Sequence, residues 1–480
     1  MMKMKKFIFS ILALSAVFVS CNTELDINQD PDALNADNAP LSAQLPAGIT
    51  GIVGSEGAGM AIFGGFWSQY WTQSNAANQF KDIDNYSSST SDYNFIWDGM
   101  YDALGDIRNV KRRALAEGNW KYYLIATTLE VQASQVLTDM YGSVPYKEAN
   151  NKLILNPHFD TGEEIYGYMI EDLDDALAKD LSTSSGSIPG TDDLIFGGNM
   201  ANWTKFANTL KLKIYMRQTT SSRATIANAG IQQMLTDGVQ FLDTDASMTQ
   251  FSDAINQSNP LYEYVIRRLN VATNLRMSRT LSSFLADNSD ARKGQYYASG
   301  NALNQGDYNN PAGSGTIAVV KLSATTPVLL MSKEESLFLQ AEAAERYSSG
   351  VGAEALYDAA VSANFNRYSL SASTLLAGSY AYPTAGTFDQ KLEAIITQKW
   401  IASFPGNGFE AFFEKNRTGY PRTSTVPQTA AGYVSGQITY AVNGSTGGLF
   451  PKRIVYPLSE RNANSNALPL VPITTPIWWE

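Results

Sequence analysis

Residues 97–140 read WDGMYDALGDIRNVKRRALAEGNWKYYLIATTLEVQASQVLTDM, and this stretch decides the fold. Its first half carries apolar residues at the spacing that lines one face of an α-helix, namely Trp97, Tyr101, Leu104 and Ile107. Gly118 interrupts this pattern, and a second helix is predicted from about Trp120 to Met140. Because the connection between them is so short, the two helices are predicted to lie antiparallel.

Two further helix pairs are predicted toward the C-terminus. Their first helices begin with capping-box patterns, Ser332 with Glu335 and Thr387 with Gln390. Gly350 ends the first of these helices, and the next helix has a face of small residues, formed by Ala355, Ala359 and Ala363. Pro405 ends the helix that begins near Thr387. Repeated helix–turn–helix units of this length resemble tetratricopeptide repeats.

Three long segments between the predicted helices are rich in small and polar residues: 182–191, 299–316 and 423–448. Long loops in a compact protein often build a functional surface. Strand signals are few, and the clearest is Gln437–Val442. The sequence therefore predicts a mainly α-helical protein with long loops and little β-structure.

The N-terminus has the three parts of a bacterial export signal. Lys3, Lys5 and Lys6 supply positive charge, residues 7–19 are hydrophobic, and Ser20 precedes Cys21, the only cysteine of the chain. This 13-residue segment is too short to form a permanent membrane-spanning helix. Residues 18–21 resemble the lipobox of bacterial lipoproteins, so we expect cleavage before Cys21 and its lipidation. The alternative is an ordinary signal peptide that ends near a cysteine by chance.

The predicted organisation is a signal peptide at residues 1–20, a lipid tether at 21–40 and a single helical domain at 41–480. Removal of the signal changes the net charge from −11 to −14, because it contains three lysines and no acid. This acidity argues against a nucleic-acid partner, which requires a basic surface. No later segment reaches the roughly 18 apolar residues that a membrane-spanning helix needs.

The sequence offers few components of a catalytic site. His158, beside Pro157 in a predicted loop, is the only histidine, so a metal site with several histidines is excluded. The chain has neither a GxSxG nucleophile motif nor a P-loop. A pair of carboxylates of the glycosidase type stays possible, because 46 acidic residues offer many candidates. We predict a protein that is not an enzyme and that binds no cofactor and no catalytic metal.

Aromatic residues concentrate between Phe63 and Tyr101, where 11 of 39 residues are Phe, Trp or Tyr. Aromatic rings stack on the apolar faces of sugars, while amides and carboxylates bind the hydroxyl groups. The ligand-binding residues predicted here are Trp67, Tyr70, Trp71, Asn75 and Gln79. The alternative is that rings such as Phe66, Tyr70 and Trp97 belong to the core, because they also fall at helical spacing.

A second candidate surface is the predicted loop 292–310. It contains Tyr296, Tyr297 and Tyr308 among Asn, Gly and Gln residues. Loop tyrosines with amide neighbours are not easily buried between two helices, so we expect these three to bind ligand as well.

Six stretches of the chain resemble the SusD/RagB family: TDMYGSVPYKEA at 138–149, WTKFANTLKLK at 203–213, QKWIASF at 398–404, EKNRTGYP at 414–421, RIVYP at 453–457 and PIWW at 476–479. Together with the lipobox-like segment, they extend the resemblance over nearly the whole mature chain. We interpret most of these motifs as structural, since Trp203 with Phe206 and Leu210, and Ile396 with Trp400, form helical core stripes.

The resemblance implies a helical protein with four tetratricopeptide-like pairs in a right-handed superhelical scaffold. It implies attachment to the outer membrane, an outward-facing orientation, and a SusC-like TonB-dependent transporter as the partner that receives a glycan or peptide nutrient. The alternative function is a helical-repeat scaffold for protein interaction, or a carboxylate-dependent glycan hydrolase, because a fold does not fix a function. The sequence does not distinguish a glycan from a peptide ligand.

Overall fold

Residues 39–309 and 316–480 are described by the structure, which is a computed structural model. The predicted signal peptide, most of the tether and Cys21 lie outside the described residues. Residues 41–480 group together by their contacts.

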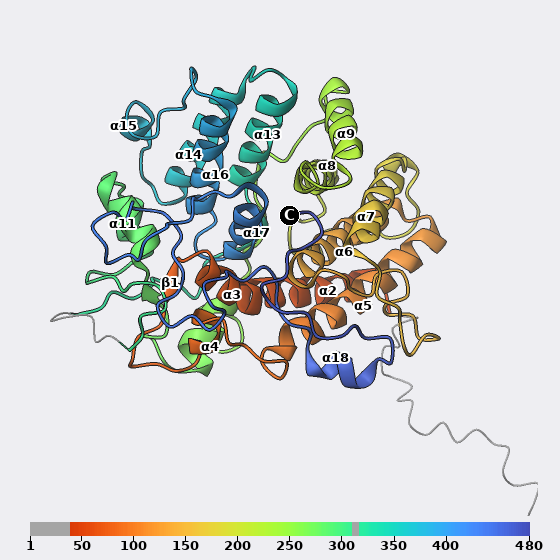
Figure 1. The fold of residues 1–480 in the computed structure, drawn as a ribbon. Helices are drawn as coiled ribbons and strands as arrows, with labels where there is room; N and C mark the ends of the chain where they lie inside the picture. The colour runs from red at the N-terminus through yellow and green to blue at the C-terminus, as the bar shows by residue number, and fades with distance from the viewer. Residues whose placement is uncertain (1–38, 310–315) are drawn as a thin grey trace, which may run out of the picture. The chain divides into compact units, whose positions relative to one another are not determined.

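Helices account for most of the regular structure (Figure 1). The first are α2 (Leu41–Ser55), the π-helix η1 (Glu56–Met60), α3 (Ala61–Trp67), α4 (Lys81–Asp84), α5 (Asn94–Glu117) and α6 (Trp120–Tyr141). The next are α7 (Gly162–Leu177), η2 (Leu181–Thr183), α8 (Met200–Arg217), α9 (Ala224–Thr236), α10 (Pro260–Tyr262), η3 (Glu263–Arg268), α11 (Arg279–Asp287) and α12 (Arg292–Tyr296). The last are α13 (Lys333–Tyr347), α14 (Ala353–Arg367), α15 (Ser373–Leu376), α16 (Phe388–Ala402), α17 (Gly408–Thr418) and α18 (Leu458–Ala463). The predicted mainly α-helical fold is confirmed.

Helices α5 and α6 form the pair expected from residues 97–140, and they are antiparallel. Trp97, near the start of α5, contacts Tyr141 at the end of α6, with ring centroids 4.9 Å apart. Gly118 ends α5 with a φ of 67°, which glycine adopts without a steric cost. The side chain of Asn119 then caps α6 by accepting a hydrogen bond from the Tyr122 N–H.

Further tetratricopeptide-like pairs are α7 with α8, α13 with α14, and α16 with α17. Helix α6 packs on α7, and α8 packs on α13, so that neighbouring pairs contact one another. In Figure 1, α13, α14 and α16 lie side by side at one end of this arrangement, and α5, α6 and α7 lie together elsewhere.

The two predicted capping boxes differ in the structure. Thr387 and Gln390 form the complete box at the start of α16, as predicted. At the start of α13, the Ser332 hydroxyl accepts a hydrogen bond from the Glu335 N–H, but only this half of the box forms. The Glu335 carboxylate is buried instead, with its Oε1 atom 3.7 Å from Lys213 Nζ. The Glu335 carboxylate therefore contacts Lys213 in the interior and does not cap the Ser332 N–H.

The β-strands of the described residues form two short antiparallel pairs. Strand β1 (Trp71–Thr72) pairs with β3 (Arg276–Met277), and β2 (Ala246–Met248) pairs with β4 (Val328–Met331). The strand predicted at Gln437–Val442 is wrong, because Ile438 makes only an isolated bridge with Thr423 and the rest is loop. Ile438 is buried against the body of the protein, but Val442 is 56% exposed, so the apolar positions of this segment do not share one buried face.

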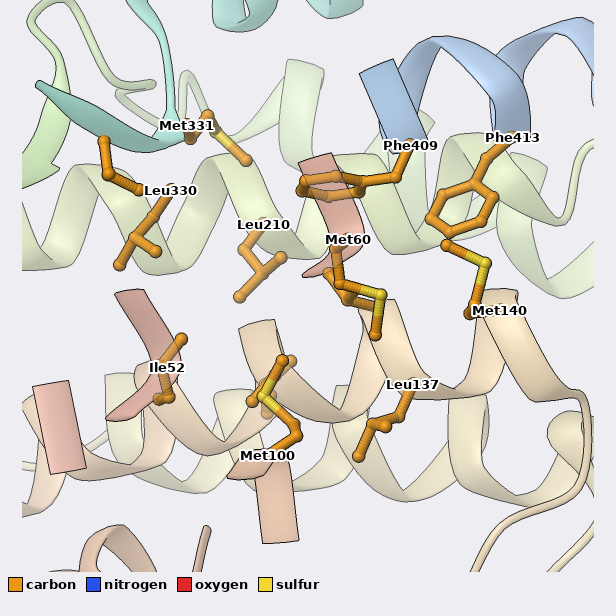
Figure 2. Packing of buried hydrophobic residues seen from close by; sticks show 14 of the residues in the cluster. Ile52, Met60, Met100, Leu137, Met140, Leu210, Leu330, Met331, Phe409 and Phe413 are labelled. Atoms are coloured by element: carbon orange, nitrogen blue, oxygen red, sulfur yellow. The ribbon is translucent and has the colours of Figure 1, made fainter. Parts of the chain in front are cut away.

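The main hydrophobic core joins elements that are far apart in the sequence. Figure 2 shows a part of it in which residues from α5, α6, α8 and α17 pack together, among them Met100, Leu137, Leu210, Phe409 and Phe413. A second cluster of buried residues lies among α13, α14 and α16. The predicted core stripes are confirmed, because these side chains are buried: Trp203, Phe206, Leu210, Ile396 and Trp400.

Two glycines allow α3 and α17 to approach each other backbone to backbone. A Cβ atom at Gly64 would lie 1.9 Å from the backbone nitrogen of Phe409, and one at Gly408 would lie 2.7 Å from the carbonyl carbon of Gly64. Either contact is too short for a side chain, so only glycine fits at this crossing. The contact brings the end of α3 and the following Trp71 against the C-terminal helices.

Ionised side chains form a buried network where α6, α8 and α17 meet. The Arg217 guanidinium of α8 donates to Asp139 Oδ2 at 3.1 Å, to Glu410 Oε2 at 2.7 Å and to Glu414 Oε1 at 2.6 Å. Lys213 Nζ, one turn earlier, donates to Glu410 Oε1 at 3.0 Å. Removing one partner of such a network leaves a buried charge unpaired, which costs about 3–5 kcal/mol.

The motifs that carry the family resemblance meet at this network. Asp139 belongs to the 138–149 stretch, Lys213 to 203–213 and Glu414 to 414–421. Trp479 of the PIWW motif donates its indole N–H to Asp139 Oδ1 at 2.8 Å. These motifs therefore specify the packing of the helices, as the sequence analysis inferred.

Glu56 gives the structure a testable pH dependence. It is buried in η1, where Gln132 Nε2 lies 3.3 Å from its Oε1, and burial raises the pKa of Glu56 to about 8. The folded protein therefore binds a proton more tightly than the unfolded chain between about pH 4.5 and 8, and this group makes stability fall as the pH rises through that window.

We expect Glu56→Gln to remove this effect. The variant should match the wild type near pH 4.5 and exceed it by roughly 2–5 kcal/mol near pH 8, as measured by urea unfolding at both pH values. Glu171→Gln, an exposed substitution on α7, is the control and should show no such trend. A constant difference between wild type and Glu56→Gln at all pH values would contradict the prediction.

Candidate functional site

Three segments that are distant in the sequence converge on one surface: residues 72–85, 301–309 and 441–446. The Gly306 N–H donates to Thr72 Oγ1 at 3.0 Å, which ties the second segment to the first. Asn443 Nδ2 donates to the Gly306 carbonyl at 2.7 Å, and the Ser445 N–H donates to the Asn85 carbonyl at 2.8 Å. The loop 301–309 is thereby fixed to both neighbours.

Asp84, at the end of α4, holds this junction together from behind. Its carboxylate accepts hydrogen bonds from Thr72 Oγ1 at 2.7 Å, the Gln73 N–H at 2.9 Å and Gln305 Nε2 at 2.7 Å. Burial raises the pKa of Asp84 to about 7, although these hydrogen bonds act in the opposite direction. Asp84 does not reach the surface, so we assign it a positioning role.

Tyr308 is the aromatic residue that this arrangement leaves partly exposed. Its hydroxyl accepts a hydrogen bond from Asn85 Nδ2 at 3.1 Å, and Lys81 Nζ lies 4.9 Å from the centre of its ring. Asn75 and Gln79 are exposed on the loop that leads into α4. We call these five residues the Tyr308 surface. An aromatic ring bordered by amides suits a ligand with both apolar faces and hydroxyl groups.

A polar pocket of about 520 Å³ adjoins the Tyr308 surface. The polar residues that line it are Arg279, Ser282, Ser283, Lys293, Asn301, Asn304 and Asp307. Asn304 Nδ2 donates to Asp307 Oδ2 at 3.2 Å, and Asp307 directly precedes Tyr308. The pocket and the Tyr308 surface therefore form one candidate binding region, with hydrogen-bonding groups in the pocket and an aromatic ring beside it.

Three of the eight predicted ligand-binding residues lie at this region: Asn75, Gln79 and Tyr308. Asn85, at the end of α4, bonds to Tyr308, and Asn75 and Gln79 lie on the exposed loop that leads into the same helix. Sequence reasoning missed Lys81, Asn85, Asn301 and Asn304. The amides that precede Tyr308 in the loop were the available signal, whereas nothing local places Lys81 near that loop.

The other five predicted residues are core residues: Trp67, Tyr70, Trp71, Tyr296 and Tyr297. Each is at most 6% exposed. The candidate site therefore excludes all five, although Trp67 also lines a separate pocket at the end of α17. For the first cluster, burial in the core is the alternative stated in the sequence analysis.

Contacts with the C-terminal half explain this burial. The Tyr70 hydroxyl donates to the Trp400 carbonyl, and Trp400 donates its indole N–H to the Ser68 carbonyl at 2.8 Å. Tyr296 closes α12, within the segment expected to be a loop, and stacks on Phe404 with ring centroids 4.1 Å apart. The Tyr297 hydroxyl donates to the Tyr70 carbonyl at 2.8 Å. Residues about 100 positions or more away therefore cover these rings.

Two further searches cover the described residues. Within residues 39–309 and 316–480, no helix is both long and apolar enough to cross a membrane. The same residues contain no group of three or more His, Cys, Asp or Glu side chains arranged to hold a metal ion.

A family model described as "Starch-binding associating with outer membrane" and named SusD-like matches residues 56–443. The chain belongs to this SusD-like family. The match includes both the Tyr308 surface and the helix pairs. A search among curated protein sequences gives no significant match for this SusD-like protein.

Solved structures share the fold of this SusD-like protein. A SusD homologue from Bacteroides uniformis ATCC 8492 is 23% identical, with a TM-score of 0.74 over 91% of this chain and 99% of that chain. A chitin-binding SusD homologue from Flavobacterium johnsoniae is 21% identical, with a TM-score of 0.74 over 91% of this chain and 98% of that chain. At these identities, the similarity establishes the architecture.

The burial of Trp71 predicts the result of truncating it. Trp71→Ala should lower the free energy of unfolding by about 3–5 kcal/mol, because it removes a large buried ring. Tyr308→Ala, at the surface, should leave stability nearly unchanged. Chemical denaturation of the two variants beside the wild type measures both effects. If Trp71→Ala were as stable as the wild type but bound ligand more weakly, the prediction would be wrong and Trp71 would belong to the binding site.

Proposed function

We propose that this SusD-like protein is a lipoprotein of the outer-membrane surface that binds a glycan nutrient and delivers it to a SusC-like TonB-dependent transporter. The description of the matching family, starch-binding and associated with the outer membrane, supports this proposal. The chitin-binding homologue with the same fold supports a glycan over a peptide. The lipobox-like segment ending at Cys21 supports attachment through lipid.

The Tyr308 surface is the observation that carries the proposed binding function. A sugar ring has apolar faces and a polar edge, and stacking on Tyr308 would place its hydroxyl groups near Lys81 and Asn85. Asn75 and Gln79, on the exposed loop before α4, are further candidate polar contacts. The adjoining polar pocket would receive the next sugar units of a longer chain. The hydrogen bonds to Asp84 and Gly306 hold the contributing segments in place, so little ordering would be needed on binding.

We infer that the bound glycan is not cleaved. Asp84, a carboxylate of the Tyr308 surface junction, is buried and accepts three hydrogen bonds that hold it in a structural position. His158 is largely exposed in a loop, with its Nδ1 atom 2.9 Å from Glu148 Oε2. It is not among the residues of the candidate region, and its replacement should leave glycan binding unchanged.

Replacing Tyr308 tests the binding site. Tyr308→Ala should weaken binding of maltoheptaose or chitohexaose, whichever the wild type binds, by about 1–3 kcal/mol, the range typical of an aromatic anchor. Isothermal titration calorimetry gives the affinities, and chromatography of the recovered sugar should show no shortening.

Tyr168→Ala is the matched control. Tyr168 of α7 is also partly exposed and also lies under a lysine, with Lys147 Nζ 4.0 Å from its ring centre. This control should bind the glycan like the wild type. Equal affinities for wild type and Tyr308→Ala would refute the proposed site, and time-dependent cleavage by purified protein would refute the non-enzymatic function.

Lipid attachment has a separate test. Cys21→Ala should abolish incorporation of labelled palmitate and release the protein from the outer-membrane fraction, because no other cysteine can be acylated. Fractionation of cells that express each form measures the change. A Cys21→Ala protein that stays on the membrane after a high-salt wash would contradict lipid anchoring.

A further inference from the structure

A second pocket has a volume of about 300 Å³. One of its lining residues is Tyr86, which directly follows Asn85 of the Tyr308 surface in the sequence. The pocket is enclosed by the end of α17, by Trp67 at the end of α3, and by the segment 448–452. The Tyr440 ring supports two of its aromatic residues, with centroids 5.5 Å from Tyr86 and 5.8 Å from Phe450. None of the residues lining this pocket belongs to the Tyr308 surface or to the polar pocket beside it.

Two lysines supply the charge of this pocket, Lys415 of α17 and Lys452. Lys415 Nζ donates to the Gly419 carbonyl at 2.7 Å, and no carboxylate in the described part of the chain forms an ion pair with it. Lys452 Nζ donates to Asn416 Oδ1 at 3.1 Å and pairs with Glu480. The residues that line the pocket include no Asp or Glu, although acidic residues outnumber basic ones by 46 to 35 in the chain.

The missing carboxylate partner of Lys415 affects its pKa. Burial and the neighbouring charge of Lys452 lower the pKa of Lys415 to about 8. The ammonium group is therefore held in a place that destabilises it, and an anion bound between the two lysines would relieve this cost. Lys452 has Glu480 as its partner, but Lys415 has no carboxylate partner among the described residues, and this leaves the pocket suited to an anionic ligand.

The pocket also has aromatic and hydrogen-bonding walls. Trp67, Tyr86, Phe412 and Phe450 line it with aromatic surface, and Asn416 and Thr423 add hydrogen-bonding groups. Aromatic walls with a few polar groups suit the ring of a sugar, and the volume is at the lower end of the range for small-ligand pockets. An inorganic anion alone would leave most of this apolar surface without contact.

We propose that this pocket binds an acidic sugar unit, with its carboxylate or sulfate group between Lys415 and Lys452. The inference rests on the proposed function, because it supposes that the protein binds glycans, and it adds a preference for anionic ones.

The test compares an oligogalacturonide trimer with its methyl ester, which has the same sugar rings without the charge. The wild type should bind the trimer at least ten-fold more tightly than the ester, and added salt should weaken only the trimer. A galactose-6-sulfate oligosaccharide forms a second arm, which distinguishes a sulfate from a carboxylate ligand. Calorimetry measures all three affinities.

Lys415→Gln and Lys452→Gln should each weaken binding of the preferred anionic sugar at least ten-fold, and Lys415→Arg should retain more binding than Lys415→Gln. Lys205→Gln of α8 carries the same change of charge outside the pocket and should bind like the wild type. Thermal melting of every variant verifies that it is folded.

Unchanged binding in both glutamine variants, or no binding of either anionic sugar by the wild type, would overturn the inference. The proposed function would stand in that case if Tyr308→Ala still weakened binding of a neutral glycan. If the wild type bound neither neutral nor anionic glycans, both the proposed function and this inference would be overturned.

Discussion

The buried ion network around Arg217 is the interaction on which the arrangement of the helices depends. One guanidinium binds carboxylates from α6 and α17, and its own helix, α8, lies between the N-terminal and C-terminal helix pairs. Buried ions require partners at defined distances, whereas apolar contacts tolerate small shifts. The network therefore fixes which faces of the pairs meet. Asp139, Lys213 and Glu414 of this network come from stretches that identify the family, which explains why those stretches do not reveal the ligand.

A second constraint acts where α3 crosses α17. The absence of a side chain at Gly64 and Gly408 permits backbone contact, and this contact draws the aromatic segment after α3 under the C-terminal helices. Trp71 then becomes core, in contact with Phe404, whereas the chain that continues into α4 returns to the surface. The same segment thus supplies both a buried aromatic cluster and the amides of the Tyr308 surface.

The candidate binding region combines a rigid base with residues contributed by loops. Asp84 joins the start of the segment 72–85 to Gln305 of the loop 301–309 through three neutral donors, and this holds the loop that presents Tyr308. Long loops attached to a helical scaffold can vary in sequence without disturbing the core. This separation of scaffold from surface is consistent with a family of shared architecture that is described as starch-binding and is similar to a chitin-binding homologue.

The sequence by itself determined the helix pairs, the cap at Thr387, the core stripes at Trp203 and Trp400, and the family, because periodicity, caps and motifs are local properties. It also pointed to Asn75, Gln79 and Tyr308. Only the tertiary structure decided that Trp71 and Tyr296 are core residues, that Glu335 leaves its cap for an ion network, and that Lys81 approaches Tyr308. Burial and pairing depend on residues a hundred or more positions away, and a helical or loop pattern contains no information about which distant surface will cover it.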